Sequence, residues 1–438
     1  MIHVLLRYIG IKTKLLDHIK EEIQKITPEN GYILDMFAGS TIVGQYLSDD
    51  FNVFSNDIQK YSFFVGKATL EINKNFDYKL LSYKKIEQSV YFKNNYEYLS
   101  GLLNKPLLYE KELFQKLQNN PDLSILLEFK NYYDNSPYCG HFNNAKVPKC
   151  FANMGDIYST EMYKKKFKDK GIYALFSLAY ACPYFSLSQA IYVDSFRYAL
   201  DKMKENKEII DTEFYIYMNY LIYYLGNIVT SVGDHFAQPQ QLKISEEKRL
   251  KREINKIIAK KTLDKDILFN ELEKQFKKIV YKSKDNKMFC EDYKRLFENE
   301  YSEYMKKVNT IYIDPPYTNA HYSRFYHILE TLVKYDYPDI KYFGRYRTDR
   351  YQSPFCIRSE ALKEFDEMIN LCFSNKKNLV ISYSDTSQCI LSKDEITKIC
   401  KRYYANVNIN QIDYLYRNFG QKPNKVKGNE LLIVCKVI

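Results

Sequence analysis

A rigid turn, Asp314-Pro315-Pro316-Tyr317, follows a short apolar segment, residues 310–313, whose length and composition are those of a buried strand. Two consecutive prolines fix the backbone and remove two N–H donors, so the chain must leave the sheet at this point. In open α/β sheets, ligands bind outside the carboxyl ends of the strands. The turn therefore predicts an α/β fold with a ligand site beside Asp314.

The chemical groups of this turn suit an amino group attached to a flat ring. Asp314 and the Pro315 carbonyl could accept the two amino hydrogens, while Tyr317 stacks on the ring. Both hydrogen bonds would favour the pyramidal geometry in which the nitrogen lone pair, otherwise delocalised into the ring, can attack a methyl donor. The turn is thus consistent with methyl transfer to an exocyclic base nitrogen, although an ordinary Pro-Pro exit from a strand has the same sequence.

Two further strands that end in acids are predicted near the start of the chain. Residues 32–40 form an apolar strand, the acid Asp35 and a small-residue turn, and a helix follows over about 41–47. Gly39 would let the backbone approach a ligand closely. Residues 52–57 form a second strand that ends in Asp57, an acid well placed to accept hydrogen bonds from ribose hydroxyls. Since the GxGxxG phosphate loop is absent, the pattern favours a nucleoside-type cofactor without a pyrophosphate.

Five motifs together resemble one enzyme family. They are, in chain order, Arg7-Tyr8-Ile9-Gly10-Ile11-Lys12, Asp35-Met36-Phe37-Ala38-Gly39-Ser40, Asp57, Asp292 and the Asp314–Tyr317 turn. This order resembles that of the S-adenosylmethionine-dependent DNA adenine-N6 methyltransferases, and the long stretch between the two halves resembles the alpha (Dam-like) branch. The resemblance covers residues 1–70 and 286–438.

The resemblance implies a role for each matched position. Tyr8, Lys12 and the 35–40 turn would surround the methionine part of S-adenosylmethionine, Asp57 would hold the ribose, and Asp292 would lie near the adenine. The implied cofactor-binding set is Tyr8, Lys12, Asp35, Phe37, Ala38, Gly39, Ser40, Asp57, Ile58 and Asp292, and the implied catalytic set is Asp314, Pro315, Pro316 and Tyr317. The turn departs from the pattern because no second glycine follows Gly39, and Tyr8 replaces a tryptophan seen in some relatives. The chemistry requires no metal. A solvated helix lysine and a surface acid are the alternative interpretations of Lys12 and Asp292.

Length and the resemblance together predict two domains. We expect a Rossmann-like methyltransferase sheet formed by residues 1–70 and 286–438, with a large, mostly helical target-recognition insertion at 71–285. Within the insertion, the sequence predicts helices over 75–135, loops and strands over 136–198 and an aromatic helix over 208–232. At the end of the chain, a strand at 379–385 and an antiparallel pair at 411–417 and 430–435 would complete the sheet.

Several basic and amide side chains of the insertion are candidates for contact with nucleic acid, which the net charge of +11 would attract. A Gly/Pro-bounded loop at 233–241 carries His235, Gln238, Gln240 and Gln241, which could read base edges or merely form a turn after a helix. Residues 243–287 predict an antiparallel helical hairpin that turns near 262–264. Its basic face, with Lys248, Arg249 and Arg252, could contact phosphates or simply be solvated.

The segment after the Pro-Pro turn carries a second group of candidates. A helix is predicted over 327–335, and His321 and Tyr322 precede it closely enough to shape the pocket. No strong base is needed there, because the amino group loses its proton only after it has become cationic. Residues 342–358 form a compact basic loop, with Arg345, Arg347 and Arg350 as a candidate phosphate clamp.

The predicted substrate is double-stranded DNA, from which the target adenine would be flipped out. Alternatives are an RNA adenine or DNA cytosine-N4 methyltransferase, and a catalytically inactive DNA-specificity subunit. The nine cysteines form no CxxC pair, and no run of 18 or more apolar residues is present to span a membrane. We therefore expect a cytoplasmic protein that binds DNA as a monomer, with a cognate restriction endonuclease as a possible partner.

Overall fold

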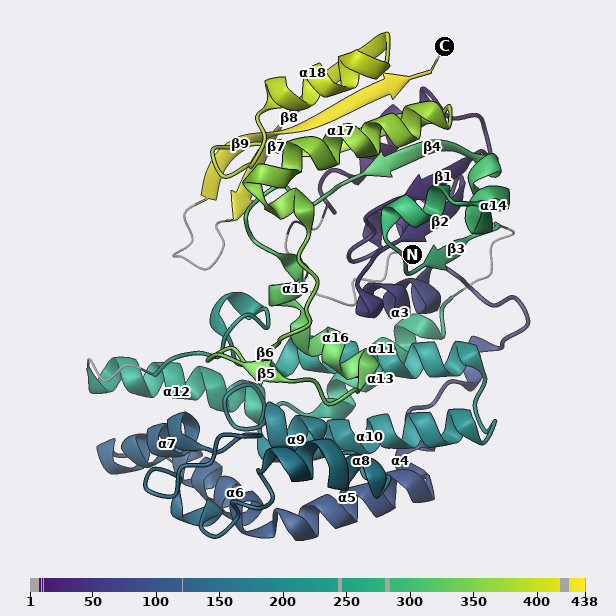
Figure 1. The fold of residues 1–438 in the computed structure, drawn as a ribbon. Coiled ribbons are helices and arrows are strands. Elements are labelled where there is room, and N and C mark those ends of the chain that lie inside the picture. Colours follow the sequence, from purple (N-terminus) through teal and green to yellow (C-terminus); the bar gives the residue numbers. More distant parts are fainter. Residues whose placement is uncertain are drawn as a thin grey trace. The chain divides into compact units, whose positions relative to one another are not determined.

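The computed structural model describes residues 8, 10, 12–119, 121–242, 246–279, 284–417 and 425–437. The chain divides into two compact units (Figure 1). Unit 1 comprises residues 1–76, 279–325 and 350–438, and unit 2 comprises 77–278 and 326–349. Residues 326–349, which the sequence analysis assigned to the catalytic half, thus belong to the mostly helical unit. None of the helices in the described ranges is long and apolar enough to cross a bilayer.

Unit 1 contains a seven-stranded, mostly parallel sheet. Its strands, in spatial order, are β3 (Lys287–Phe289), β2 (Asn52–Asn56), β1 (Tyr32–Asp35), β4 (Val308–Ile313), β7 (Asn378–Asp385), β9 (Lys425–Lys436) and β8 (Asn406–Arg417). The first five strands are parallel, and the last two form an antiparallel pair that closes one edge. The structure confirms the α/β sheet, the strands before the acids and this terminal pair.

Side chains alternate between the two faces of the sheet along each strand, and helices cover both faces, so both are buried. On one face, Ile33 and Val380 pack with α1 (Leu16–Gln24) and α2 (Ile42–Leu47). On the other face, Leu34 and Ile381 pack with α14 (Ser302–Lys307), α17 (Arg358–Ser374) and α18 (Lys393–Tyr403). The helix α3 (Lys60–Thr69) packs against β3.

The parallel arrangement brings three predicted acids to the same edge of the sheet. β1 ends at Asp35, β2 ends one residue before Asp57, and β4 ends one residue before Asp314. The last residue of β1, Asp35, pairs with Ser55 of β2 and with Tyr312 of β4, so these three ends are adjacent. Acids that lie far apart in the sequence therefore share one site. Arg7, Ile9 and Ile11 of the first motif lie outside the described residues.

Unit 2 is formed mainly by helices. They are α4 (Lys84–Gln88), α5 (Val90–Leu102), α6 (Asn104–Gln118), α7 (Leu123–Asn135), α8 (Phe167–Asp169), α9 (Leu175–Ala179), α10 (Leu187–Glu205), α11 (Asp211–Ile228), α12 (Glu247–Lys261), α13 (Lys265–Phe276) and α16 (His327–Lys334). A short hairpin, β5 (Ile340–Lys341) with β6 (Tyr346–Arg347), completes it. The aromatic helix predicted at 208–232 corresponds to α11.

The prediction of loops and strands over 136–198 is correct for the loops of residues 136–159 and wrong for the strands. All of this segment is described in the structure, and after those loops it forms a π-helical turn (Met162–Lys166), α8, α9 and the first part of α10, with only isolated β-bridges. The helix α10 begins with a capping box, in which Ser186 and Gln189 bond each other's backbone amides. This Ser-x-x-Gln pattern was the sequence signal for a helix, and the nearby glycines and prolines obscured it.

The helices α12 and α13 and their turn were predicted, but the helical hairpin is not formed. Thr262 ends α12, and the Asp264 side chain caps α13. Within the part of the chain that the structure describes, the two helices do not pack along each other: α12 packs on α7 and α11, and α13 packs on α11. The reason is that the aromatic side of α11 takes up the apolar face of α13, with Tyr220 and Tyr224 against Phe269.

A buried carboxylate organises the centre of unit 2. Asp194 on α10 is fully buried and accepts hydrogen bonds from the amides of Phe176 and Ser177, both at 2.8 Å, from the Ser177 hydroxyl at 2.6 Å and from the Tyr335 hydroxyl. These bonds join α9 and the end of α16 to α10. Removal of the acceptor would leave several donors buried without a partner.

We predict that Asp194→Ala lowers the free energy of unfolding by about 3 kcal/mol, since unpaired buried polar groups cost about 1–3 kcal/mol each. Urea denaturation followed by circular dichroism measures this change. Glu205→Gln, on the exposed end of the same helix, is the matched control and should change stability by less than about 0.5 kcal/mol. Equal midpoints for Asp194→Ala and the parent would contradict the structural role of this carboxylate.

Candidate active site

One pocket of unit 1 lies at the carboxyl ends of β1, β2 and β4, with an empty volume of about 1030 Å³ that includes open solvent. Its walls contain every residue predicted from the motifs to bind the cofactor or to act in catalysis. They are Tyr8, Lys12, Asp35, Phe37, Ala38, Gly39, Ser40, Asp57, Ile58, Asp292, Asp314, Pro315, Pro316 and Tyr317. The fold thus brings both ends of the motif series to one cavity.

The turn after β1 depends on a glycine. Gly39 has a φ of 51°, and a Cβ at this position would lie 2.8 Å from the Tyr8 ring. Its amide donates to Asp57 Oδ2 at 2.8 Å, and its carbonyl accepts from Ser62 Oγ at 2.6 Å. Thr41, in the part of the turn without a second glycine, also has a positive φ of 62°. A β-branched residue is strained in this conformation, so the turn is held by its surroundings.

Asp57 connects two loops of the pocket. Its Oδ2 accepts from the Gly39 amide, and its Oδ1 accepts from the Gln59 amide, both at 2.8 Å. These bonds fix the orientation of the carboxylate at the pocket wall. The acid expected to bind ribose therefore also positions the turn expected to contact methionine.

Asp35 is a buried carboxylate in the same pocket. Its side chain is almost fully buried, and neither carboxylate oxygen has a hydrogen bond of good geometry among the described residues, although the nearby Gly44 amide favours the ionised form. Burial raises the pKa of Asp35 to about 8, and the nearby charges of Asp314 and Asp57 act in the same direction. A positively charged ligand group would supply the partner that this acid lacks, so the site is suited to a cation.

Asp314 lies against a buried ammonium group. Lys12 Nζ is 3.1 Å from Asp314 Oδ1 and 2.7 Å from Glu430 Oε1, and it lies 5.4 Å from the centroid of the Tyr317 ring. Burial raises the pKa of Asp314 to about 6, against the opposing effect of Lys12. Burial also disfavours the Lys12 ammonium, but Asp314 and Glu430 outweigh it and hold the Lys12 pKa well above its usual value. Asp314 is therefore mainly ionised at neutral pH and can accept hydrogen bonds.

The Pro-Pro turn is held from its far side. The Tyr317 carbonyl accepts from the Ile390 amide at 2.8 Å, and Thr318 forms a β-bridge with Cys389. The Tyr317 ring packs edge-on against Tyr383, with centroids 5.4 Å apart. Pro315 is buried, while Pro316 and Tyr317 remain partly exposed to the pocket. A rigid acceptor with an accessible aromatic ring is the arrangement expected from the sequence.

Tyr322 and His321 also line the pocket, as predicted. The Tyr322 ring stacks on Tyr8 at a centroid distance of 5.5 Å and an angle of 23°. His321 Nδ1 has no hydrogen-bond partner among the described residues. Burial, with a smaller contribution from Arg350, lowers the pKa of His321, so this side chain is neutral at pH 7. Both residues shape the pocket beside the Asp314 turn.

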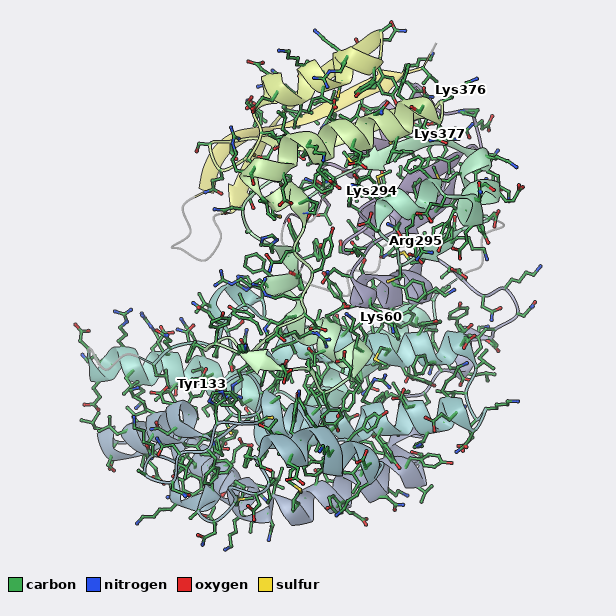
Figure 2. The ribbon with its side chains drawn as sticks, viewed as in Figure 1. Lys60, Tyr133, Lys294, Arg295, Lys376 and Lys377 are labelled. Atoms are coloured by element: carbon green, nitrogen blue, oxygen red, sulfur yellow. The ribbon has the colours of Figure 1, made fainter. Side chains whose placement is uncertain are left out.

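Asp292 begins the loop that follows β3. Its side chain accepts from the Lys294 amide at 3.0 Å and so caps a short 3-10 turn. Lys294 in turn pairs with Glu364 and Glu367 of α17, at 3.1 and 3.0 Å (Figure 2). The acid expected near the cofactor's adenine is thus fixed at the pocket wall.

Some residues that line the pocket carried no recognisable sequence signal. Tyr293 and Phe355 were not predicted, and their rings pack against the predicted Phe37 at centroid distances of 5.8 and 5.5 Å. Asn56 exchanges two hydrogen bonds of 3.0 Å with the backbone of Glu291 and so joins the ends of β2 and β3. Aromatic and amide residues occur throughout this chain, so only the fold identifies these.

The predicted DNA-reading loop lies in unit 2. His235 is buried, and its Nδ1 accepts from the Ala237 amide at 3.2 Å. Gln238 and Gln240 are half-exposed and line a second pocket together with Arg249 of α12. His235 therefore supports the loop from inside, whereas the two glutamines are accessible. Lys248, Arg249 and Arg252 are exposed on α12, and Arg252 lies 3.7 Å from Glu253.

The phosphate clamp predicted around 342–358 requires correction. Arg345 is buried under Tyr138 and donates to the carbonyls of Ala179 at 2.5 Å and Ala181 at 3.4 Å. Arg347 is also buried and forms ion pairs with Asp336 at 2.6 Å and Asp349 at 2.8 Å. Both guanidinium groups are satisfied inside unit 2, so they offer no charge to a DNA backbone. Arg350 belongs to unit 1 and is half-buried.

Comparison with known proteins agrees with this site. The chain is 26% identical to the type II methyltransferase M.FokI of Planomicrobium okeanokoites over 433 residues, which is 97% of this chain and 51% of that protein. It is 25% identical to the modification methylases StsI of Streptococcus sanguinis and LlaI of Lactococcus lactis subsp. lactis, over 97% of this chain and 50% and 53% of those proteins. The chain thus spans about half the length of these relatives.

The family model described as D12 class N6 adenine-specific DNA methyltransferase matches residues 8–399. The match includes the Tyr8–Lys12 segment, the acid-ended strands and the Asp314 turn, together with the helical segment between them. This chain therefore belongs to the D12 class of N6 adenine-specific DNA methyltransferases.

Proposed function

We propose that this chain transfers the methyl group of S-adenosylmethionine to N6 of an adenine within a specific sequence of double-stranded DNA. The observation that carries the proposal is the shared pocket, in which an ionised acceptor on a rigid turn lies beside a buried acid that the described residues leave without a counterion, and which suits a cationic ligand. Membership of the family supports adenine N6 as the acceptor. The names of the relatives support a role in a restriction-modification system, with a cognate endonuclease as partner.

The residues of the pocket fit S-adenosylmethionine. Asp35 would pair with the ammonium of the methionine part, which supplies the hydrogen-bond donors that this buried acid lacks. Asp57 would accept from the ribose hydroxyls, and Phe37 with Asp292 would border the adenine. When bound, the cofactor supplies a methyl group on a sulfonium centre. The excess of carboxylates in the pocket favours that positive charge.

The protein contributes orientation and hydrogen bonding to the reaction. Asp314 and the Pro315 carbonyl accept the two hydrogens of the adenine amino group, and Tyr317 stacks on the ring. This arrangement directs the nitrogen lone pair toward the methyl group for in-line attack, and fixed orientation supplies much of the acceleration. The amino group becomes cationic as the bond to carbon forms, and it then loses a proton without the help of a strong base. Because the acceptor is paired in duplex DNA, the base must be flipped out.

Unit 2, which comprises residues 77–278 and 326–349, would act as the target-recognition part that the sequence analysis assigned to residues 71–285. We infer that Gln238 and Gln240 read base edges and that the exposed basic side of α12 contacts phosphates. The enzyme would act in the cytoplasm and bind DNA as a monomer. An intact Lys12–Asp314 pair argues against an inactive specificity subunit.

Sequencing of host and plasmid DNA with modification-sensitive reads after expression tests the whole proposal. Modified cytosine in DNA, or modified RNA, would instead support one of the alternative methyltransferase activities.

We predict that Asp314→Ala lowers the rate of methyl transfer by at least about 100-fold, since a positioned hydrogen-bonding group is worth 10²–10³ in rate. Binding of S-adenosylmethionine should change little, because the lost carboxylate faces the acceptor. Turnover of a radiolabelled methyl group and calorimetry measure the two effects.

Tyr317→Phe should keep most of the activity, whereas Tyr317→Ala should not, because the ring and not the hydroxyl contacts the base. Equal losses in both tyrosine variants would contradict the stacking role.

We predict that binding of S-adenosylmethionine near pH 7 releases about one proton, or slightly less, from the protein. The pKa of Asp35 is about 8 in the free protein, so this acid is mainly protonated at pH 7, and pairing with an ammonium lowers its pKa. Calorimetry in buffers of different ionisation enthalpy measures the release. Asp35→Asn should bind more weakly and release no proton. The idea fails if that variant releases as many protons as the parent.

We predict that replacement of Lys248, Arg249, Lys251 and Arg252 with alanine weakens binding to all DNA sequences and reduces the salt dependence by about one unit of slope per lost phosphate contact. The matched control replaces four exposed lysines of α5 and α6, Lys93, Lys105, Lys111 and Lys116, and so removes the same total charge. In contrast to both fourfold variants, Gln240→Ala should lower the discrimination between bases by about 1–3 kcal/mol at one base pair of the recognition site. Identical salt slopes for the two fourfold variants would show that α12 is merely solvated.

A further inference from the structure

A buried acid outside the motif series contacts the site from β9. Glu430 has an exposed fraction of 0%, and its Oε1 accepts from Lys12 Nζ at 2.7 Å. The same oxygen accepts from Ser382 Oγ at 2.5 Å. Since Lys12 also contacts Asp314 Oδ1 at 3.1 Å, four side chains from separate parts of unit 1 form one continuous chain of contacts, Ser382–Glu430–Lys12–Asp314.

The position of Glu430 in the sheet is unfavourable for an acid. Strand alternation puts it on the same face as Leu432 and Val434, which pack into the apolar cluster beneath α1. A carboxylate buried among such residues loses its hydration, and an ion pair in this setting seldom stabilises a protein more than apolar packing does. A stabilising role alone therefore explains this acid poorly, whereas a role in the adjacent site explains its contacts.

Glu430 changes what Lys12 can do to Asp314. A lysine side chain is flexible, and with Asp314 as its sole counterion the ammonium would approach both oxygens of that carboxylate. Both oxygens would then be engaged in an ion pair, and neither would be a strong acceptor for an amino group. With Glu430 on its other side, the ammonium is shared, and it lies closer to Glu430 Oε1, at 2.7 Å, than to Asp314 Oδ1, at 3.1 Å.

We propose that Glu430, held by Ser382, is a positioning residue that shares the Lys12 ammonium with Asp314 and so keeps Asp314 Oδ2 available for the amino group of the acceptor base. The inference rests on the proposed function, because it assigns Asp314 to the acceptor. Glu430 touches neither substrate nor cofactor and acts through Lys12. The Ser382 hydroxyl fixes the carboxylate and satisfies part of its hydrogen-bonding capacity.

The surrounding charges give this role a pH signature. The titratable and charged groups that face Asp314 are Lys12 before α1, Asp35 of β1, Tyr312 of β4, Tyr317 and Tyr322 of the following segment and Glu430 of β9. After burial, Lys12 lowers the pKa of Asp314 and Glu430 raises it. Loss of the Glu430 charge therefore lowers the pKa of Asp314, both directly and because Lys12 then pairs with Asp314 alone.

The test measures single-turnover methyl transfer to substrate DNA against pH for the whole chain, with the parent and Glu430→Gln in parallel. The parent rate should fall as the pH decreases through the pKa of Asp314, about 6. In Glu430→Gln, the plateau rate should be lower by about tenfold or more, the acid midpoint should move to lower pH, and the affinity for S-adenosylmethionine should stay within about threefold. A merely structural role would lower the rate without moving the midpoint.

A second pair of variants keeps the inference testable if Glu430→Gln does not fold. Ser382→Ala removes the hydroxyl that holds Glu430 and should lower the plateau rate by about 2–5-fold. Ser384→Ala is the matched control, because Ser384 is a buried serine of the same strand whose hydroxyl bonds Thr386 instead, at 3.3 Å. Its rate should equal that of the parent.

The outcomes separate this inference from the proposed function. An active parent combined with parent-like rates in Glu430→Gln, an unmoved acid midpoint, or equal rates for the two serine variants would overturn the role of Glu430 alone. A well-folded parent that methylates no DNA would instead overturn the proposed function. A lower plateau with an acid midpoint shifted to lower pH supports both.

Discussion

The crowding of carboxylates at one edge of a parallel sheet governs this site. β1, β2 and β4 end side by side, and their acids Asp35, Asp57 and Asp314 line one pocket. Burial disfavours the charged form of Asp35 and so raises its pKa. The negative charges of the neighbouring acids repel a further negative charge and raise this pKa as well. The three carboxylates are therefore stabilised in different ways. Backbone amides donate to Asp57, and Lys12 forms an ion pair with Asp314. Among the described residues Asp35 has no counterion, so a positively charged ligand group could stabilise its ionised form.

The same electrostatic condition explains how a rigid turn becomes a functional one. The prolines after Asp314 fix the backbone, but they do not decide whether the carboxyl group is ionised. That depends on Lys12, which comes from the opposite end of the sequence and is itself kept charged by two carboxylates. The backbone geometry of Asp314 is therefore set by its neighbours in the sequence, whereas its protonation state depends on residues that folding brings to it. For this reason Lys12 and Glu430, which lie more than 400 positions apart in the sequence, both affect the Asp314 carboxyl group.

The sequence was most informative where a residue type can serve few purposes. An apolar run followed by an acid predicted β1, β2 and β4 and the edge at which their acids meet, and the Pro-Pro turn located Asp314. It was least informative where charge alone was the signal. Arg345 and Arg347 were predicted to contact phosphates because they lie in a compact basic loop, yet carbonyls and two aspartates satisfy them inside unit 2. Glu430 could not be found at all, since a buried acid is recognised only by the lysine that folding brings to it.

The charge distribution also bears on the proposed function, in which a cationic cofactor and DNA would both bind to this chain. The pocket of unit 1 is rich in carboxylates and would repel the phosphates of DNA, whereas it suits a cationic cofactor. The exposed side of α12 in unit 2 carries lysines and arginines that suit phosphates. A neutral base is the part of a nucleotide that can enter an acidic pocket without electrostatic cost, provided that its phosphates stay outside. Under the proposed function, extrusion of a single base from the duplex would meet this condition, because it would bring the amino group to Asp314 without the phosphates. The acidity that suits a cationic cofactor would therefore also favour a flipped-out base over an intact strand.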